Sequence, residues 1–193
     1  MKLGLGIFTV FLAASSAFGQ QVVIPRSRNA QAMIITKGGS YLGIGGLDIT
    51  ALELESGASE TVVDFSTPNQ GRMRTLAADI GAASFEARNL ANANVAKVRI
   101  HGGVGGVELD FGGQWQQDMD VNVDLALGKL TLHVPRDVGV RVEVEKFLAS
   151  FDEQGLVKRG DAYYSDNWDR AKYHLTLRAK TTFGGIELDR AND

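Results

Sequence analysis

Residues 102–110 read Gly-Gly-Val-Gly-Gly-Val-Glu-Leu-Asp: small residues come first, and apolar and polar residues then alternate. The same order begins at four other places along the chain, at Gly45, Gly81, Gly128 and Gly184. Alternation with a period of two is typical of a β-strand that buries one face. The repeated unit therefore predicts an all-β chain whose turns are marked by glycine, because glycine tolerates positive φ and close backbone approach.

The spacing of these units favours one architecture. Gly81, Gly105 and Gly128 stand 24 and 23 residues apart, which is a period typical of solenoid proteins built from stacked turns of chain. The interval from Gly128 to Gly184 is 56 residues and predicts an inserted hairpin or loop. We therefore expect a short-repeat β-solenoid, with a β-sandwich as the alternative.

The first nineteen residues have the parts of a secretory signal peptide. Lys2 supplies a positive charge, residues 3–14 form an apolar run, and small residues follow as far as Gly19. The apolar run is shorter than the roughly 17 to 25 residues that a membrane-spanning helix needs. We therefore expect export and cleavage after Gly19, or alternatively after Ala17, rather than a retained membrane anchor.

The rest of the composition bounds the class of protein. Residues 20–40 are polar and weakly patterned and predict a flexible leader, and residues 41–193 predict a single β-repeat domain. The chain has no cysteine, which excludes disulfides and suits a bacterial envelope better than a eukaryotic secretory route. Cleavage after Gly19 removes only Lys2 among the charges, so the net charge changes from −3 to −4. A mildly acidic chain argues against nucleic acid as a partner.

Four segments carry a resemblance to a known family. They are GGVGGVELDFGG from Gly102, DVNVDLALGKLTLHVPRDVGVRVEVE from Asp120, GLVKRGDAYYSDNW from Gly155 and TTFGGIELD from Thr181. From about residue 75 to residue 189 the chain resembles the C-terminal toastrack domain of bacterial cell-wall-active antibiotic response proteins (LiaF-like). It also resembles the related adhesin domains of unknown function (DUF4097-like). The resemblance implies an all-β, right-handed, single-stranded β-helix-like solenoid and a role in adhesion or in envelope stress homeostasis. It brings no catalytic motif.

One acidic segment has the pattern of a metal-binding loop. Asp118, Asp120, Asn122 and Asp124 resemble the opening of a calcium loop, but its sixth position is Val123, where such a loop needs glycine. The alternation instead predicts a solvated acidic strand face. The three histidines also lack a metal-ligand spacing. We therefore expect no metal site, no cofactor and no catalytic residues.

One aromatic and polar cluster is a candidate ligand surface. Its members are Tyr163, Tyr164, Asn167 and Trp168, in a loop that extends to Tyr173. Flat rings beside carboxylates and amides suit a sugar, because rings stack on its apolar faces while polar groups bond its hydroxyls. The alternative is that the rings cover the open end of the solenoid core.

These features predict a non-enzymatic interaction module that is periplasmic, on the cell surface or secreted. Its expected partner is an envelope glycan or an envelope protein, and after signal cleavage it is not an integral membrane protein. An alternative is a carbohydrate-binding or polysaccharide-lyase-like module that uses the loop from Tyr163 to Tyr173. Self-association is a third interpretation, because an exposed strand edge pairs readily with another chain.

Overall fold

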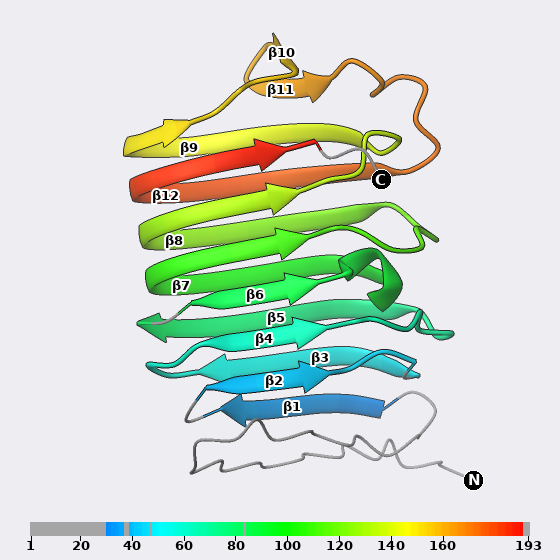
Figure 1. Cartoon of the computed structure of the whole chain (residues 1–193). Coiled ribbons are helices and arrows are strands. Elements are labelled where there is room, and N and C mark those ends of the chain that lie inside the picture. The colour runs from blue at the N-terminus through cyan, green and yellow to red at the C-terminus, as the bar shows by residue number, and fades with distance from the viewer. Residues whose placement is uncertain (1–29, 37–38, 47, 83, 191–193) are drawn as a thin grey trace, which may run out of the picture.

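The chain folds into a stack of β-coils, as the computed structural model of residues 30–36, 39–46, 48–82 and 84–190 describes (Figure 1). The predicted signal peptide lies outside these residues. The elements, in chain order, are β1 (Ala30–Thr36), β2 (Ser40–Gly43), β3 (Ile49–Ser56), β4 (Thr61–Asp64), β5 (Met73–Ala82), β6 (Phe85–Arg88), the 3-10 helix η1 (Leu90–Ala93), β7 (Val95–Asp110), β8 (Met119–His133), β9 (Gly139–Phe151), β10 (Leu156–Arg159), β11 (Ala162–Ser165) and β12 (His174–Asp189).

Each coil has a first arm and a second arm that meet at a bend. Near the N-terminal end separate strands form the arms: β1, β3 and β5 are first arms, and β2, β4 and β6 are second arms. Farther along, β7, β8, β9 and β12 each supply both arms as one long bent strand (Figure 1). The arms stack in parallel into two sheets that enclose the core, which confirms the solenoid rather than the sandwich.

The coils stack in register, so residues about 23 positions apart lie side by side. Lys97 pairs with Asp120 and Val98 with Val121, in agreement with the predicted period. Because the period is one coil, inward residues of successive coils form continuous apolar columns. One column of paired residues is fully buried, at 0% exposure throughout: Leu52, Leu76, Val98, Val121, Leu177 and Val142. Each such burial contributes about 1.5–3 kcal/mol.

The order of the coils in space differs from their order in the chain. β12 lies between β8 and β9 and pairs in parallel with both. Between β9 and β12 the chain forms the antiparallel hairpin β10–β11, and β11 pairs with β9 at Arg141 and Val142. The inserted hairpin predicted from the 56-residue interval is therefore confirmed.

The N-terminal boundary of the domain differs from the expectation. The sequence predicts a flexible leader over residues 20–40, but β1 pairs in parallel with β3 and β2 begins at Ser40. A segment with weak apolar–polar alternation can still form a strand here, because an existing sheet edge offers backbone hydrogen bonds to any extended segment. Residues 20–29 lie outside the described residues.

Glycines at the bend allow the backbones of successive coils to touch. A Cβ atom on Gly128 would lie 1.7 Å from the carbonyl oxygen of Gly105, and one on Gly184 would lie 1.7 Å from that of Gly128. Gly184 also has a φ of +129°, which side chains rarely adopt. Gly45 differs from these repeats because it lies in the turn between β2 and β3, away from the bend.

Replacing Gly184 with alanine should destabilise the protein strongly. The added Cβ would force two backbones apart and strain φ, at a cost of roughly 2–5 kcal/mol. Gly106→Ala is the matched control, because a Cβ there meets nothing within 4 Å. Urea unfolding of the two variants measures the difference, and an equal, small effect at both positions would contradict close stacking at the bend.

Candidate functional site

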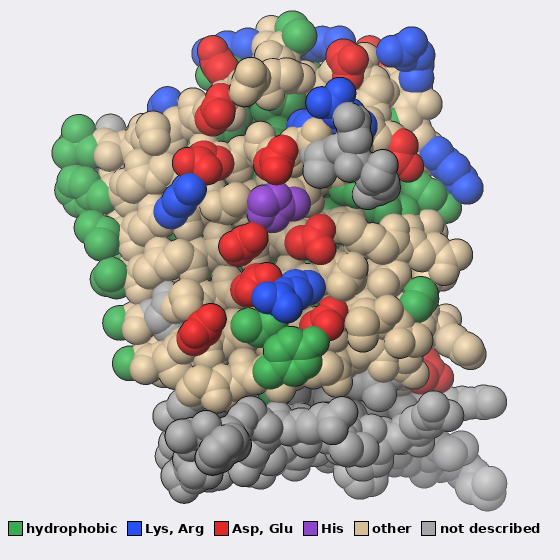
Figure 2. Space-filling view, viewed as in Figure 1, with side chains coloured by type: hydrophobic (Ala, Val, Ile, Leu, Met, Phe, Trp, Pro, Cys, Tyr) green, Lys and Arg blue, Asp and Glu red, His purple; other side chains and the backbone are tan. Residues whose placement is uncertain are grey.

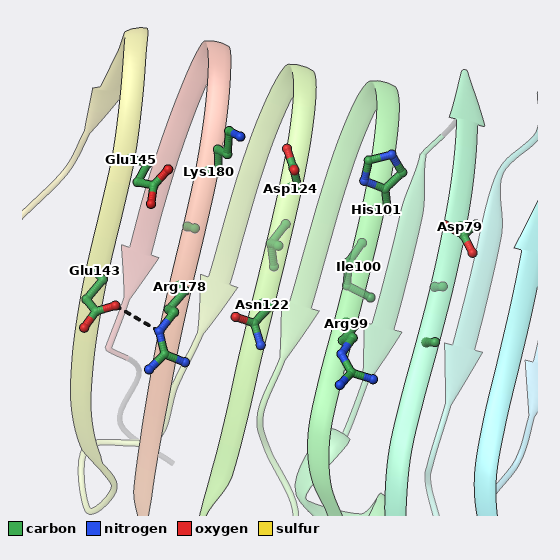
Figure 3. A pocket seen from close by; sticks show the side chains of 14 residues that line it. Asp79, Arg99, Ile100, His101, Asn122, Asp124, Glu143, Glu145, Arg178 and Lys180 are labelled. Carbon is green, nitrogen blue, oxygen red and sulfur yellow. Dashed lines mark hydrogen bonds and ion pairs between the residues drawn. The ribbon is translucent and has the colours of Figure 1, made fainter.

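A groove of about 470 Å³ crosses the outer face of the first-arm sheet, from β5 to β9. Its floor is made of outward side chains at successive levels of the stacked strands (Figure 3). The first level, called here the arginine row, pairs in register from strand to strand and consists of Ala77, Arg99, Asn122, Arg178 and Glu143. The second level, the mixed-charge row, consists of Asp79, His101, Asp124, Lys180 and Glu145.

The two arginines of the arginine row differ in their partners. Arg178 donates from Nε to Glu143 Oε2 at 2.9 Å. No described residue forms an ion pair with Arg99, whose side chain lies on the far side of Asn122 from Arg178 (Figure 3). The row therefore offers one guanidinium whose charge is free to meet an external anion.

Glu143 is the carboxylate that holds an arginine side chain of the groove in place. It accepts hydrogen bonds from Arg141 and Arg178. Burial alone would raise the pKa of its carboxyl, but the hydrogen bonds and charges of the two arginines outweigh burial and hold the pKa below its usual value. Glu143 therefore stays ionised and holds Arg178 in place.

The mixed-charge row completes the floor with groups of both signs. Its side chains follow one another at the spacing of neighbouring strands, about 4.8 Å. A ladder of donors and acceptors at a fixed spacing suits an extended polymer that lies across the strands. Within the described part of the chain, no group of three His, Cys, Asp or Glu side chains is placed to hold a metal ion.

The calcium-like segment is a strand face, as the alternation indicated. Asp118 lies before β8, and its Oδ1 accepts a hydrogen bond from the backbone N of His174 at 2.9 Å. Asp120, Asn122 and Asp124 lie on β8 and pair with residues of β7 and β12. The segment contributes two residues to the groove rather than a cation loop.

The structure divides the four predicted aromatic-loop residues between two places. The Tyr163 ring packs edge-to-face on Phe151, with centroids 5.0 Å apart. Tyr164 and Trp168 pack edge-to-face on each other at 5.4 Å, and Trp168 also meets the ring of His174 at 4.7 Å. The rings are half-buried, and their contacts with one another and with the chain are of the kind that a cap on the last coil needs.

Asn167 belongs to a second cavity, of about 490 Å³, at the C-terminal end. Its Nδ2 donates to the carbonyl oxygen of Arg136 at 3.0 Å. Arg190 donates to the carbonyl oxygens of Arg136 and Val138 at 2.9 and 3.0 Å, and burial lowers the pKa of this guanidinium. These groups mainly tie the C-terminal end of the chain to the cap. A role for Tyr163, Tyr164, Asn167 and Trp168 in ligand binding stays a prediction.

The second-arm sheet presents a different, acidic outer face, seen in Figure 2 as a surface where red side chains predominate. His133 lies between two of these carboxylates, with Nε2 2.9 Å from Glu108 and Nδ1 3.4 Å from Asp189. The two faces of the solenoid thus differ in charge, and the free arginine lies on the first-arm face.

Sequence reasoning missed the groove because its residues come from five separated strands. The period of 23 residues does place Arg99 beside Asn122. It does not place Arg178 there, because nothing in the alternation of β12 shows that this strand enters between β8 and β9.

Comparisons with known proteins agree with this architecture. Residues 75–133 match the family model for the N-terminal domain of toast_rack, DUF2154. The chain therefore contains a toast-rack-like domain, as the resemblance implied. The matching model is that of an N-terminal toast_rack domain, whereas the sequence resemblance was to a C-terminal one. No curated protein matches the chain.

A solved structure with a similar fold is that of a putative cell adhesion protein from Clostridium sporogenes. The two have a TM-score of 0.57 and 23% sequence identity, over 61% of this chain and 55% of that chain. This chain thus corresponds to about half the length of that protein, and the similarity is one of fold.

Among the described residues there is no helix of the length and hydropathy needed to cross a membrane.

Replacing Glu143 with glutamine should remove an acid-sensitive part of the stability. Because the folded-state pKa of Glu143 is lowered, the unfolded chain takes up the proton first as the pH falls. The stabilisation is complete above the unfolded pKa of about 4.3 and is lost as the pH falls through the folded pKa. The melting temperatures of native protein and Glu143→Gln should therefore converge on acidification from about pH 6 to pH 3.

Glu153→Gln, in the exposed turn before β10, is the matched control for this titration. A gap between native protein and Glu143→Gln that stays constant over the same pH range would contradict the ion-pair assignment.

Proposed function

We propose that this chain is an exported, non-enzymatic binding module of the bacterial cell envelope, which serves in adhesion or in envelope stress homeostasis. In this proposal the groove on the first-arm face holds an extended envelope glycan or protein. Residues 1–19 direct export and are removed. The similarity to a toast-rack domain and to the fold of a protein named for cell adhesion supports this class of function.

The observation that carries the proposal is the arginine row. Arg99 is unpaired among the described residues, while Glu143 fixes Arg178 two strands away. A charge kept without a partner on a rigid sheet is ready to bind an anionic group without first breaking an internal ion pair. Regular spacing of the row then favours a partner whose own groups repeat.

Retention by envelope fractions tests the proposal. The protein without residues 1–19 should be retained by peptidoglycan, by outer-membrane glycan or by a membrane protein extract. Arg99→Ala should weaken retention by about 1.5–3 kcal/mol, the range for a hydrogen bond to a charged group. Arg72→Ala, an exposed arginine in the loop before β5, is the matched control and should bind normally. Equal retention of the two variants, or cleavage of a glycan by the native protein, would contradict the proposal.

A second candidate function is glycan binding by the aromatic loop. It is favoured by the position of Asn167, which lines the C-terminal cavity close to the packed rings of Tyr164 and Trp168. In this alternative the half-exposed Trp168 stacks on a sugar, as a carbohydrate-binding or lyase-like module requires.

Trp168→Ala separates this alternative from a capping role. Glycan binding by the loop predicts that the variant loses retention on glycan and keeps its melting temperature. A cap predicts the reverse, with a loss of about 1–3 kcal/mol, since each aromatic pair contributes about 0.5–1.5 kcal/mol beyond its buried area. Thermal unfolding and glycan retention, measured on the same preparation, decide between the two.

A further inference from the structure

A column of exposed apolar side chains runs along the bend of the solenoid. Ala82, Val104, Leu127, Phe183 and Leu148 pair in register from strand to strand and form what is called here the apolar ridge. Val104, Leu127, Phe183 and Leu148 are 51%, 47%, 42% and 63% exposed. Figure 2 shows hydrophobic side chains in a column along the left margin of the molecule.

The row beside the ridge on the second-arm side is small and uncharged. It consists of Gly105, Gly128, Gly184 and Ala149, which pair in register from strand to strand. The bend needs these glycines for backbone contact, but it does not need valine, leucine or phenylalanine on the ridge, because those side chains point outward. An ordered apolar column of this kind on an otherwise charged surface marks an interaction site.

We propose that the apolar ridge packs against the same ridge of a second copy, in an antiparallel homodimer whose two-fold axis lies between β8 and β12. A two-fold axis joins a patch to itself, so both sides of the contact are apolar. This placement sets Leu127 against the partner's Phe183 and Val104 against the partner's Leu148. The two ridges also share the strand spacing of about 4.8 Å, so their side chains match along the whole contact.

The charged side chains next to the ridge favour this position of the two-fold axis over an axis on β8 or on β12. Three residues before the ridge, each strand carries a member of the mixed-charge row. With the axis between β8 and β12, Asp124 faces the partner's Lys180, and His101 faces the partner's Glu145. An axis on β8 would oppose two copies of Asp124, and an axis on β12 would oppose two copies of Lys180. Both shifts are unfavourable because they bring like charges together.

The size of the ridge sets the strength of the dimer. A standard interface buries about 800 Å² on each partner, and five side chains along one edge supply only part of that area. We therefore expect a dimer in reversible, concentration-dependent equilibrium with monomer. The arginine row lies farther from the bend than the mixed-charge row, so dimerisation leaves Arg99 open.

Sedimentation of the purified protein over a range of concentrations tests the proposal. The native protein should dimerise reversibly, and Leu127→Asp should be monomeric at every concentration. Val157→Asp is the matched control, since Val157 is 55% exposed on β10, away from the ridge. Asp124→Lys should weaken the dimer at least tenfold, and the charge swap Asp124→Lys with Lys180→Asp should restore it. The swap preserves opposite charges at positions 124 and 180, both between β8 and β12 within the chain and across the axis.

A cross-link gives a second readout that does not depend on stability. The chain has no cysteine, so Leu127→Cys introduces a single thiol beside the axis. Oxidation should yield covalent dimer with Leu127→Cys but not with Val157→Cys. A native protein that is monomeric up to about 1 mM, a dimer unaffected by Leu127→Asp, or a ridge that instead binds phospholipid vesicles as a monomer would each overturn the proposal.

Discussion

The contact on which the rest of the molecule depends is that between glycine backbones at the bend. At Gly128 and Gly184 a single added carbon would overlap a glycine carbonyl oxygen of the neighbouring coil. Only glycine allows the backbones of neighbouring coils to approach so closely. This close approach permits a single register between neighbouring strands. Register is therefore set at the bend and transmitted along both arms, which is why outward side chains far apart in the chain stand in straight rows.

Those rows explain how one chain can carry several distinct surfaces. The first-arm face holds the groove with Arg99, the second-arm face is acidic, and the bend between them carries the apolar ridge. Each row takes one residue from each coil, so each row repeats at the strand spacing. The hairpin and the aromatic rings of the cap cover part of the β9 edge, which limits uncontrolled growth of the stack there.

The repeat was predictable because it rests on local chemistry. The alternation of apolar and polar residues indicates which face of a strand is buried. The intervals of 24 and 23 residues between successive turn glycines indicate the length of a coil. The place of β12 was not predictable, since a strand that alternates can pair with any open edge, and this one enters between β8 and β9. For the same reason Arg178 could not be placed beside Asn122. The aromatic loop was identified as a cluster, but its sequence does not show that Tyr163 packs on Phe151 while Tyr164 packs on Trp168.

Hydrogen exchange of the backbone amides, measured with and without retained envelope material, tests most directly whether the first-arm face is the binding surface. Slower exchange on binding is expected in residues 97–101, 120–124 and 176–180, which carry the arginine row and the mixed-charge row across three neighbouring strands. Protection confined to residues 156–173, or to the acidic second-arm face, would contradict a binding site in the groove and would move the function of this solenoid to its cap or its opposite side.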